Sequence, residues 1–310
     1  NDDSTTKAEL ADSLVTNKTS EALTSVQALN KSGVKANVVG GAAGSAAAIG
    51  GTVVINNLNN KVLANITNSQ IGKAGTNKNG KVQALAQNIV EADFKSGQVS
   101  AALGIGAAAG VGITTIDTSV VTNIDNSKIY AQDIDLFAYE LRDVDQLATN
   151  VSAGTAAIGA NVLVTNIGTA VQNFTDSDGK EDKTIDNAYS DVEQSLVNQA
   201  GTLTDGNTFG AFDATELDKA HTQSVTAGRG GLSSAEGVQV VVQNNSLLQA
   251  TSQLTAKAMG KNDINMTAGS VSYGQYALNA GVGILDVEHN IGVTIDDSEL
   301  KAGVIDLSTE

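Results

Sequence analysis

The sequence predicts an all-β protein, a parallel β-helix (β-solenoid) with loop insertions of variable length. The first observation is that the 310 residues include no proline, a residue that lacks a backbone donor and is confined to edges and bulges of sheets. The second is that 41% of the residues are hydrophobic but only 3% are aromatic, which favours a thin core of aliphatic side chains. The third is an internal repeat.

The repeat consists of an aliphatic residue followed, fourteen positions later, by a serine and then, two positions further on, by Ile or Leu. Three clear copies occupy residues 55–71, 113–129 and 284–300. A fourth, at residues 163–177, keeps the spacing, and a degenerate copy anchored on Ser252 lies at residues 238–254. Because the motif is constant while the distance between copies varies, we expect stacked rungs of about five-residue strands with loops inserted between them.

The aliphatic residue that opens each copy is expected to point into the core. Residues in equivalent positions of successive rungs would then stack on one another as a ladder: Ile55, Ile113, Leu163 and Ile284. The abundant Asn residues suit the turns between strands, since Asn tolerates the left-handed backbone conformation.

The chain is expected to begin with a flanking or eccentric segment at residues 1–35, for which a helix is one alternative. Residues 36–310 form the repetitive solenoid, with polar or charged loops inserted near residues 72–81, 175–187 and 201–223. The first fourteen residues are acidic and polar, unlike a signal peptide, and we expect the sequence to be a segment of a longer protein.

Two uncharged stretches, residues 36–56 and 99–116, approach the length of a membrane-spanning helix. Over residues 99–114 the larger aliphatic residues occupy odd positions, whereas the even positions hold Gly, Ala, Ser and Thr. This period of two predicts a strand, because a helix would mix both sets around its circumference. A pore-forming or membrane-active toxin segment stays open as an alternative function.

Composition argues against several classes of protein. The chain has no cysteine and two histidines, so Cys-based zinc or redox sites have no ligands and a histidine-based site has few. The formal net charge of -16 repels phosphate backbones, and no nucleic-acid partner is expected.

One acidic run resembles the start of a calcium loop, because alternating carboxylates and a Gly turn can surround a hard cation. The candidate calcium ligands are Asp176, Asp178 and Asp182. A solvated acidic loop is the favoured interpretation, and no other cofactor is expected.

A second acidic group flanks the segment LFAYEL at residues 136–141. It consists of Asp133, Asp135, Asp143 and Asp145. Outward-facing strand charges are the favoured interpretation, and we expect no enzymatic activity. A polysaccharide-active β-helix enzyme is the alternative, which requires these carboxylates to line a groove.

The small residues of the alternating stretch define a candidate self-association strip. If the aliphatic residues point inward, a smooth outer strip is formed by Gly104, Gly106, Ala108, Gly110 and Gly112. A flat strip of this kind would allow another sheet to approach closely.

The segments NITNSQI (65–71), NIDNSKI (123–129) and TIDDSEL (294–300), together with the Gly/Ala-rich alternation, resemble the repeat region of large bacterial filamentous haemagglutinin-like and leukotoxin-like exoproteins. These are adhesins of the two-partner-secretion or autotransporter type. The resemblance implies a right-handed parallel β-helix, export through an outer-membrane partner, and a secreted or cell-surface role in adhesion, filament or biofilm assembly. The implied partners are further copies of the protein or a host-cell receptor.

Overall fold

The computed structural model describes residues 2–16, 19–75, 80–168, 237–288 and 290–310. In these parts the chain consists of strands and turns without any helix, and all strand pairs within the sheets are parallel. The predicted fold class, an all-β parallel β-solenoid, is therefore confirmed.

The strands form two sheets, which we call A and B. Sheet A has seven strands: β1 (Asp2–Ala11), β4 (Ala47–Thr67), β7 (Ile105–Asp125), β9 (Ala156–Gly168), β10 (Val238–Gln243), β12 (Tyr276–Glu288) and β13 (Ile291–Ile295). Sheet B has eight: β2 (Leu14–Val15), β3 (Leu23–Gly44), β5 (Gln70–Ile71), β6 (Lys81–Ala102), β8 (Lys128–Ala153), β11 (Leu247–Tyr273), β14 (Glu299–Lys301) and β15 (Val304–Thr309).

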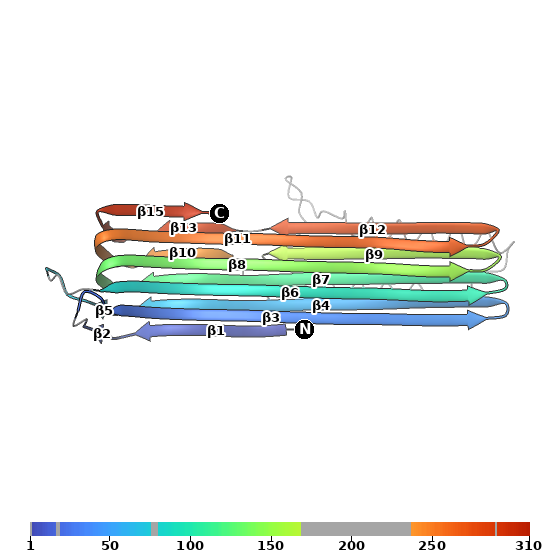
Figure 1. Ribbon diagram of the computed structural model, residues 1–310, viewed down its shortest axis with the longest axis horizontal. Coiled ribbons are helices and arrows are strands. Elements are labelled where there is room, and N and C mark those ends of the chain that lie inside the picture. Colours follow the sequence, from blue (N-terminus) through green and yellow to red (C-terminus); the bar gives the residue numbers. More distant parts are fainter. Residues whose placement is uncertain (1, 17–18, 76–79, 169–236, 289) are drawn as a thin grey trace.

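Each rung runs out along sheet B and returns along sheet A (Figure 1). For example, β6 passes through a short turn at Leu103 and Gly104 into β7, and β7 turns at Asn126 and Ser127 into β8. We call the end with the first kind of turn the hairpin end and the other the corner end; they lie at the right and left of Figure 1. The rungs stack from the N-terminal strands upward.

The strands are much longer than the expected five residues: β6 has 22 residues and β8 has 26. Their burial alternates along almost the whole length, because the opposite sheet continues to cover the inner face. A strand of this kind needs no turn until the facing layer ends. The prediction of short strands was therefore wrong, although the period of two on which it rested is observed.

The N-terminal segment belongs to the solenoid and is not a flanking helix. Strand β1 pairs with β4 and strand β3 pairs with β6 over its full length. Leu10 and Val26 pack with the main apolar cluster, as alternating strand residues do. The expected loop near 72–81 separates β5 from β6, whereas those near 175–187 and 201–223 lie outside the described residues.

The uncharged stretches 36–56 and 99–116 lie in strands and the turns between them, as predicted. Within the described ranges, no helix has the length and apolar character needed to cross a membrane.

The repeat copies stack in register, with one shift. Ile55 is paired with Ile113, and Ile113 is paired with Val164, which is in turn paired with Ile284. Leu163, the residue predicted for this ladder, is one position out of register. A one-residue slip exchanges the two faces of a strand.

The paired residues also face outward, contrary to the expectation, whereas Leu163 points inward as expected, against Gly112. In β7 the even-numbered residues point toward sheet B, since Thr118 contacts Arg142 of β8 across the gap. Ile113 therefore lies on the outer face of sheet A, where it forms a cluster with Val111, Val162 and Val164.

The serines that anchor the repeat stack at the corner end. The backbone N–H of Ser69 donates to Oγ of Ser127 at 3.1 Å, and that of Ser127 donates to Oγ of Ser246 at 3.1 Å. The degenerate copy is therefore anchored by Ser246 and not by Ser252. Ser177 of the fourth copy lies outside the described residues.

The space between the sheets changes character along the strands. Near the corner end it holds a large aliphatic cluster that includes Ile66, Ile124 and Leu136. A second, smaller cluster around Leu58, Phe94 and Val144 follows toward the middle. Toward the hairpin end the inner face carries polar and very small residues, such as Gln98, Asn150 and Gly110.

Candidate interaction surface

The four predicted aspartates of β8 lie on its outer side, on the surface of sheet B. Asp133 and Asp135 are near the corner end, while Asp143 and Asp145 follow about 26 Å further along the extended strand. Because both pairs belong to one face of a nearly straight strand, they do not converge, and the groove that the enzyme alternative requires is not formed by them. The interpretation as outward-facing strand charges fits this placement.

Neighbouring charges partly neutralise this surface. Nζ of Lys81 lies 3.4 Å from Oδ2 of Asp133, and burial raises the pKa of Asp135, an effect that Lys81 opposes and Asp133 reinforces. Asp145 accepts a hydrogen bond from Nδ2 of Asn265 at 3.1 Å. Asp133 and Asp145 therefore take part in an ion pair and a hydrogen bond between rungs.

The outer face of sheet B loses its charges toward the hairpin end. Three residues stack in register on successive strands, namely Val99, Val151 and Val271. Their side chains are 50%, 45% and 63% exposed, and the neighbouring Val39 and Tyr273 are 80% and 82% exposed. We call these five residues the valine patch.

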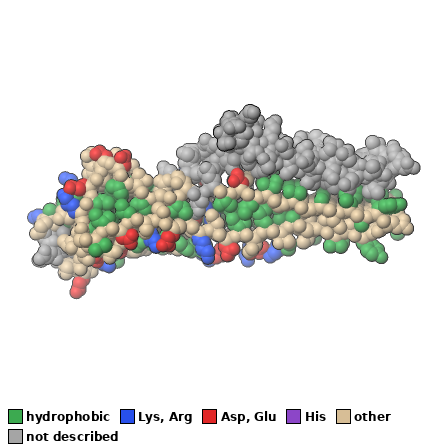
Figure 2. All heavy atoms as spheres, turned by 90° about the horizontal axis from the view of Figure 1, so that it is seen from above, with side chains coloured by type: hydrophobic (Ala, Val, Ile, Leu, Met, Phe, Trp, Pro, Cys, Tyr) green, Lys and Arg blue, Asp and Glu red, His purple; other side chains and the backbone are tan. Residues whose placement is uncertain are grey.

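Uncharged residues flank the valine columns on the same face, and Lys95, diagonal to Val39, is the charged residue next to the patch. Positions next to it in the ladder are Gly97, Thr149 and Gly269 on one side, and Ala101 and Ala153 on the other. Figure 2, which views the stack from its C-terminal edge, shows the charged side chains among the coloured residues toward the corner end and the middle, and apolar or uncharged side chains toward the right-hand end. Contiguous exposed apolar surface of this kind marks interaction sites in soluble proteins.

The predicted self-association strip faces the opposite way. A Cβ atom added to Gly110 would lie 2.5 Å from Oδ1 of Asn161 and 3.4 Å from Oδ1 of Asn150, which belongs to sheet B. A Cβ atom on Gly112 would lie 2.6 Å from Cδ2 of Leu163. Of the remaining strip residues, Gly106 and Ala108 share the inner face with these glycines, and Gly104 lies in the hairpin turn.

The small residues therefore make room for side chains inside the molecule and do not form an outer strip. The aliphatic residues of the same strand, which we expected inside, occupy the outer face. The glycine strip therefore offers no outer surface for contact between molecules. The valine patch on sheet B replaces it as the candidate surface.

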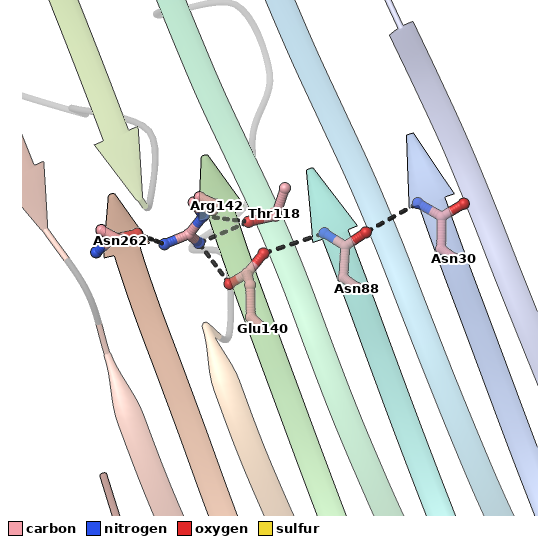
Figure 3. A network of polar contacts seen from close by, with 6 residues as sticks. All are labelled: Asn30, Asn88, Thr118, Glu140, Arg142 and Asn262. Atoms are coloured by element: carbon pink, nitrogen blue, oxygen red, sulfur yellow. Dashed lines mark hydrogen bonds and ion pairs between the residues drawn. The ribbon is translucent and has the colours of Figure 1, made fainter. Parts of the chain in front are cut away.

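A buried polar layer separates the two apolar clusters (Figure 3). Glu140 and Arg142, both fully buried, form an ion pair with 2.6 Å between Oε2 and Nη2. Nε and Nη2 of Arg142 donate to Oγ1 of Thr118 on sheet A at 3.0 and 2.6 Å. Nη1 donates to Oδ1 of Asn262 on the next rung at 3.1 Å.

The layer continues across sheet B toward the N-terminal rung. Nδ2 of Asn88 donates to Oε1 of Glu140 at 3.1 Å, and Nδ2 of Asn30 donates to Oδ1 of Asn88 at 2.9 Å. Burial lowers the pKa of Arg142, whereas the carboxylates of Glu140 and Asp117 raise it. The layer has structural partners on each side and presents no atom to a substrate.

Sequence reasoning missed this ion pair, although a signal was present. Leu136, Ala138, Glu140, Arg142 and Val144 occupy alternate positions of one strand. Once the apolar members of this series are assigned to the inner face, the two charged residues between them must lie there too.

Other candidates lie outside the described residues: Asp176, Asp178 and Asp182 of the calcium hypothesis, and His221 and His289. Within the described ranges, no group of three or more His, Cys, Asp or Glu side chains is arranged to hold a metal ion.

Comparison with known proteins gives no relative for this chain. No protein-family model matches it, and neither does any curated protein or solved structure.

Proposed function

We propose that the chain is a structural and adhesive segment of a secreted or cell-surface bacterial filamentous protein. In this proposal it forms a rigid β-solenoid for adhesion or for filament and biofilm assembly. The observation that carries the proposal is the stacking of long parallel strands in register across two sheets, from β1 to β15. The export route through an outer-membrane partner belongs to the same proposal and rests on the family resemblance.

The geometry supports a mechanical role because each rung is tied to its neighbours along its whole length. Strand β8 pairs with β6 on one side and with β11 on the other. Bending such a stack would break many backbone hydrogen bonds at once. A solenoid of this kind presents long flat surfaces, and its stability is a sum over neighbouring repeats.

The valine patch is the surface through which we propose that two copies associate. The chain carries a formal net charge of -16, so two copies repel each other except where their facing surfaces are uncharged. A second copy also presents the same spacing of about 4.8 Å between rungs, which allows the valine columns of two molecules to interdigitate. A second copy therefore fits the patch in both charge and spacing.

Association is tested by sedimentation velocity with the double variant Val151→Asp/Val271→Asp. We expect association of the unaltered chain that grows with concentration, and at least a tenfold weaker association of the variant. The control Ser25→Asp/Gln27→Asp places the same two charges on the exposed outer side of β3, outside the valine patch, and is expected to associate as before. Equal association of all three proteins would contradict the contact.

Adhesion is tested separately by the binding of the labelled chain to bacterial and host-cell surfaces. If the chain stays monomeric but binds cells through the valine patch, the occupant is a receptor and the proposed contact between copies is wrong. Electron micrographs of the intact parent protein, showing straight unbranched filaments, would support the structural role, and flexible or globular particles would contradict it.

A further inference from the structure

The inner faces near the hairpin end carry amide and hydroxyl side chains in place of an apolar core. On sheet B these are Gln98 and Asn150, exposed by 2% each, and Gln146, exposed by 4%. On sheet A they include Asn161 and Asn56, exposed by 1% and 9%. Buried polar side chains require hydrogen-bond partners.

Small residues on adjacent strands and on the facing sheet give these side chains their space. A Cβ atom on Gly40 or Gly50 would overlap the side-chain amide of Gln98. A Cβ atom on Gly110 would likewise overlap Oδ1 of Asn161. The glycines therefore hold open a gap whose lining is polar.

The hydrogen bonds of two asparagines fix which of their atoms face this gap. Nδ2 of Asn150 donates to the backbone oxygens of Ala160 at 2.5 Å and Ala108 at 3.3 Å, and Nδ2 of Asn161 donates to the backbone oxygen of Gly269. Their Oδ1 atoms therefore point the other way, and neither has a hydrogen-bond partner within the described ranges.

A small cavity lies between Asn56 and Gln146. Its lining combines the polar side chains of Ser96 and Thr114 with the apolar ones of Val54, Phe94 and Leu163. Nδ2 of Asn56 and both Oε1 and Nε2 of Gln146 are buried and have no hydrogen-bond partner in the described part of the chain. The cavity has room for the centre of about one water molecule.

We propose that this cavity is a binding site for internal water, held between Asn56 of β4 and Gln146 of β8. The water accepts a hydrogen bond from Nδ2 of Asn56 and donates one to Oε1 of Gln146, and the hydroxyls of Ser96 and Thr114 offer further partners. Water suits the site because it is neutral, both donates and accepts hydrogen bonds, and is small enough for a cavity that holds the centre of about one water molecule. This inference does not depend on the proposed function.

The site is tested by counting long-lived water molecules with magnetic relaxation dispersion of water oxygen-17 nuclei. The unaltered chain is expected to show a dispersion step, and the double variant Asn56→Leu/Gln146→Leu is expected to lose the amplitude of about one water. Both residues are replaced together so that no partner amide is left alone. The control Thr149→Val alters the exposed outer side of the same strand and is expected to keep the full amplitude.

Two outcomes would overturn the proposal: no dispersion step in the unaltered chain, or an undiminished step in the folded double variant. If the double variant does not fold, a crystal structure of the unaltered chain decides. Electron density for a water molecule within 3.2 Å of Asn56 Nδ2 and Gln146 Oε1, an ordinary hydrogen-bond distance, supports the site. A direct hydrogen bond between the two amides refutes it.

Discussion

Arg142 shows at the scale of one residue how the interior tolerates a charge. Its guanidinium group contacts Glu140, Thr118 and Asn262, so each of its nitrogens has a partner. A buried ion pair adds little net stability over apolar residues of the same volume, but removing one partner leaves an uncompensated charge.

We therefore expect Arg142→Met to lower the free energy of unfolding by about 3 to 5 kcal/mol, because Glu140 stays buried without its cation. The measurement is equilibrium denaturation in urea. The double variant Glu140→Leu/Arg142→Met removes both charges and is expected to recover most of the loss. A double variant as unstable as the single one would show that the network and not the lone charge determines the cost.

The buried carboxylate of Asp117 in β7 is only partly compensated by the cations near it. The side chain is 3% exposed and its Oδ1 has no hydrogen-bond partner within the described residues. Burial raises the pKa of this carboxyl from 3.8 to about 6, although the cations of Arg142 and Lys61 act in the opposite direction. The folded state therefore binds the proton more tightly than the unfolded state.

The sign of the pH dependence follows from this difference. Between pH 4 and pH 6 the folded chain holds more protons on Asp117 than the unfolded chain, so the contribution of Asp117 to stability falls as the pH rises through this window. Asp117→Asn is expected to remove this contribution and to stabilise the fold at pH 7 by about 1 to 2 kcal/mol.

Thermal unfolding of this variant from pH 3.5 to pH 7.5 measures the effect, with Asp263→Asn, on the exposed outer side of β11, as the control. A pH profile of Asp117→Asn parallel to that of the unaltered chain would show that the carboxyl is solvated in the folded state.

At the scale of the element, the corner turns combine a left-handed residue with a stacked serine. Asn68 and Asn126 have φ of 48° and 44°, and Nδ2 of Asn126 donates to Oδ1 of Asn68 at 2.8 Å. Asn adopts this conformation at low cost. The following serine hydroxyls bond to the backbone two residues earlier, as in Ser127 Oγ to Asp125 O at 2.7 Å.

The serine ladder gives a prediction with an internal control. Ser127 is buried, and its Oγ accepts from the backbone N–H of Ser69. We expect Ser127→Ala to destabilise the fold by about 1 to 3 kcal/mol, because a buried N–H loses its acceptor. Ser298 occupies the same turn in the last rung, and its hydroxyl makes the same local bond to Asp296 O at 2.8 Å.

Since Ser298 is partly exposed, Ser298→Ala is expected to cost about 0.5 to 1 kcal/mol. Urea denaturation compares the two variants. Equal losses would indicate that the local bond within the turn, which both serines make, accounts for the whole effect.

The sequence predicted the strands and their stacking, but it assigned the wrong face at the hairpin end. The rule that larger aliphatic residues point inward fails for β7, where Val111 and Ile113 lie outside and Gly110 and Gly112 inside. The inner face there must accommodate amides such as Asn150 from the opposite sheet, and only very small residues leave the space. This requirement depends on a strand far along the chain, which a local pattern cannot reveal.

The pairing register of the repeat was predicted only to within one residue, again because a local pattern does not show which residues pair across distant strands. The aliphatic run at residues 162–164 offers neighbouring candidates, and the spacing to Ser177 selected Leu163 over Val164. In the structure Val164, and not Leu163, is paired with Ile113 of β7 and Ile284 of β12. The backbone hydrogen bonds along a strand set one register for all of its residues. The candidate surface could not be predicted from the sequence either, because the valine patch combines residues from four strands that are far apart in the chain.

At the scale of the whole molecule, the chain is a flat and broad slab. A strand of 26 residues such as β8 spans about 85 Å, whereas each additional rung adds about 4.8 Å to the stack. A filament built from such rungs would be a ribbon whose sheet B face carries charged pairs such as Lys31 and Glu91 along one part and the uncharged valine patch along the other. The missing prolines fit this geometry, because every described strand is paired along at least one side and inner strands such as β6 and β8 are paired along both sides over most of their length.

The two ends of the slab differ in what holds the sheets together, and this difference predicts their opening behaviour. Near the corner end, β8 packs Ile129, Ile134 and Leu136 into an apolar cluster with 0% exposure. Near the hairpin end the same strand places Gln146 and Asn150 between the sheets. Apolar burial contributes about 25 cal/mol per Å², whereas buried hydrogen bonds contribute little net stability.

Amide hydrogen exchange, read by NMR or mass spectrometry, tests this gradient within one strand. We expect residues 129–138 of β8 to exchange with the protection of global unfolding and residues 146–152 to exchange at least tenfold faster through local opening. Strand β8 is a suitable probe because residues 134–138 and 146–152 are paired with a strand on both sides, so edge effects are matched when these two stretches are compared. Uniform protection along β8 would mean that the polar half is as cooperative as the apolar half, with the rung as the unit that unfolds.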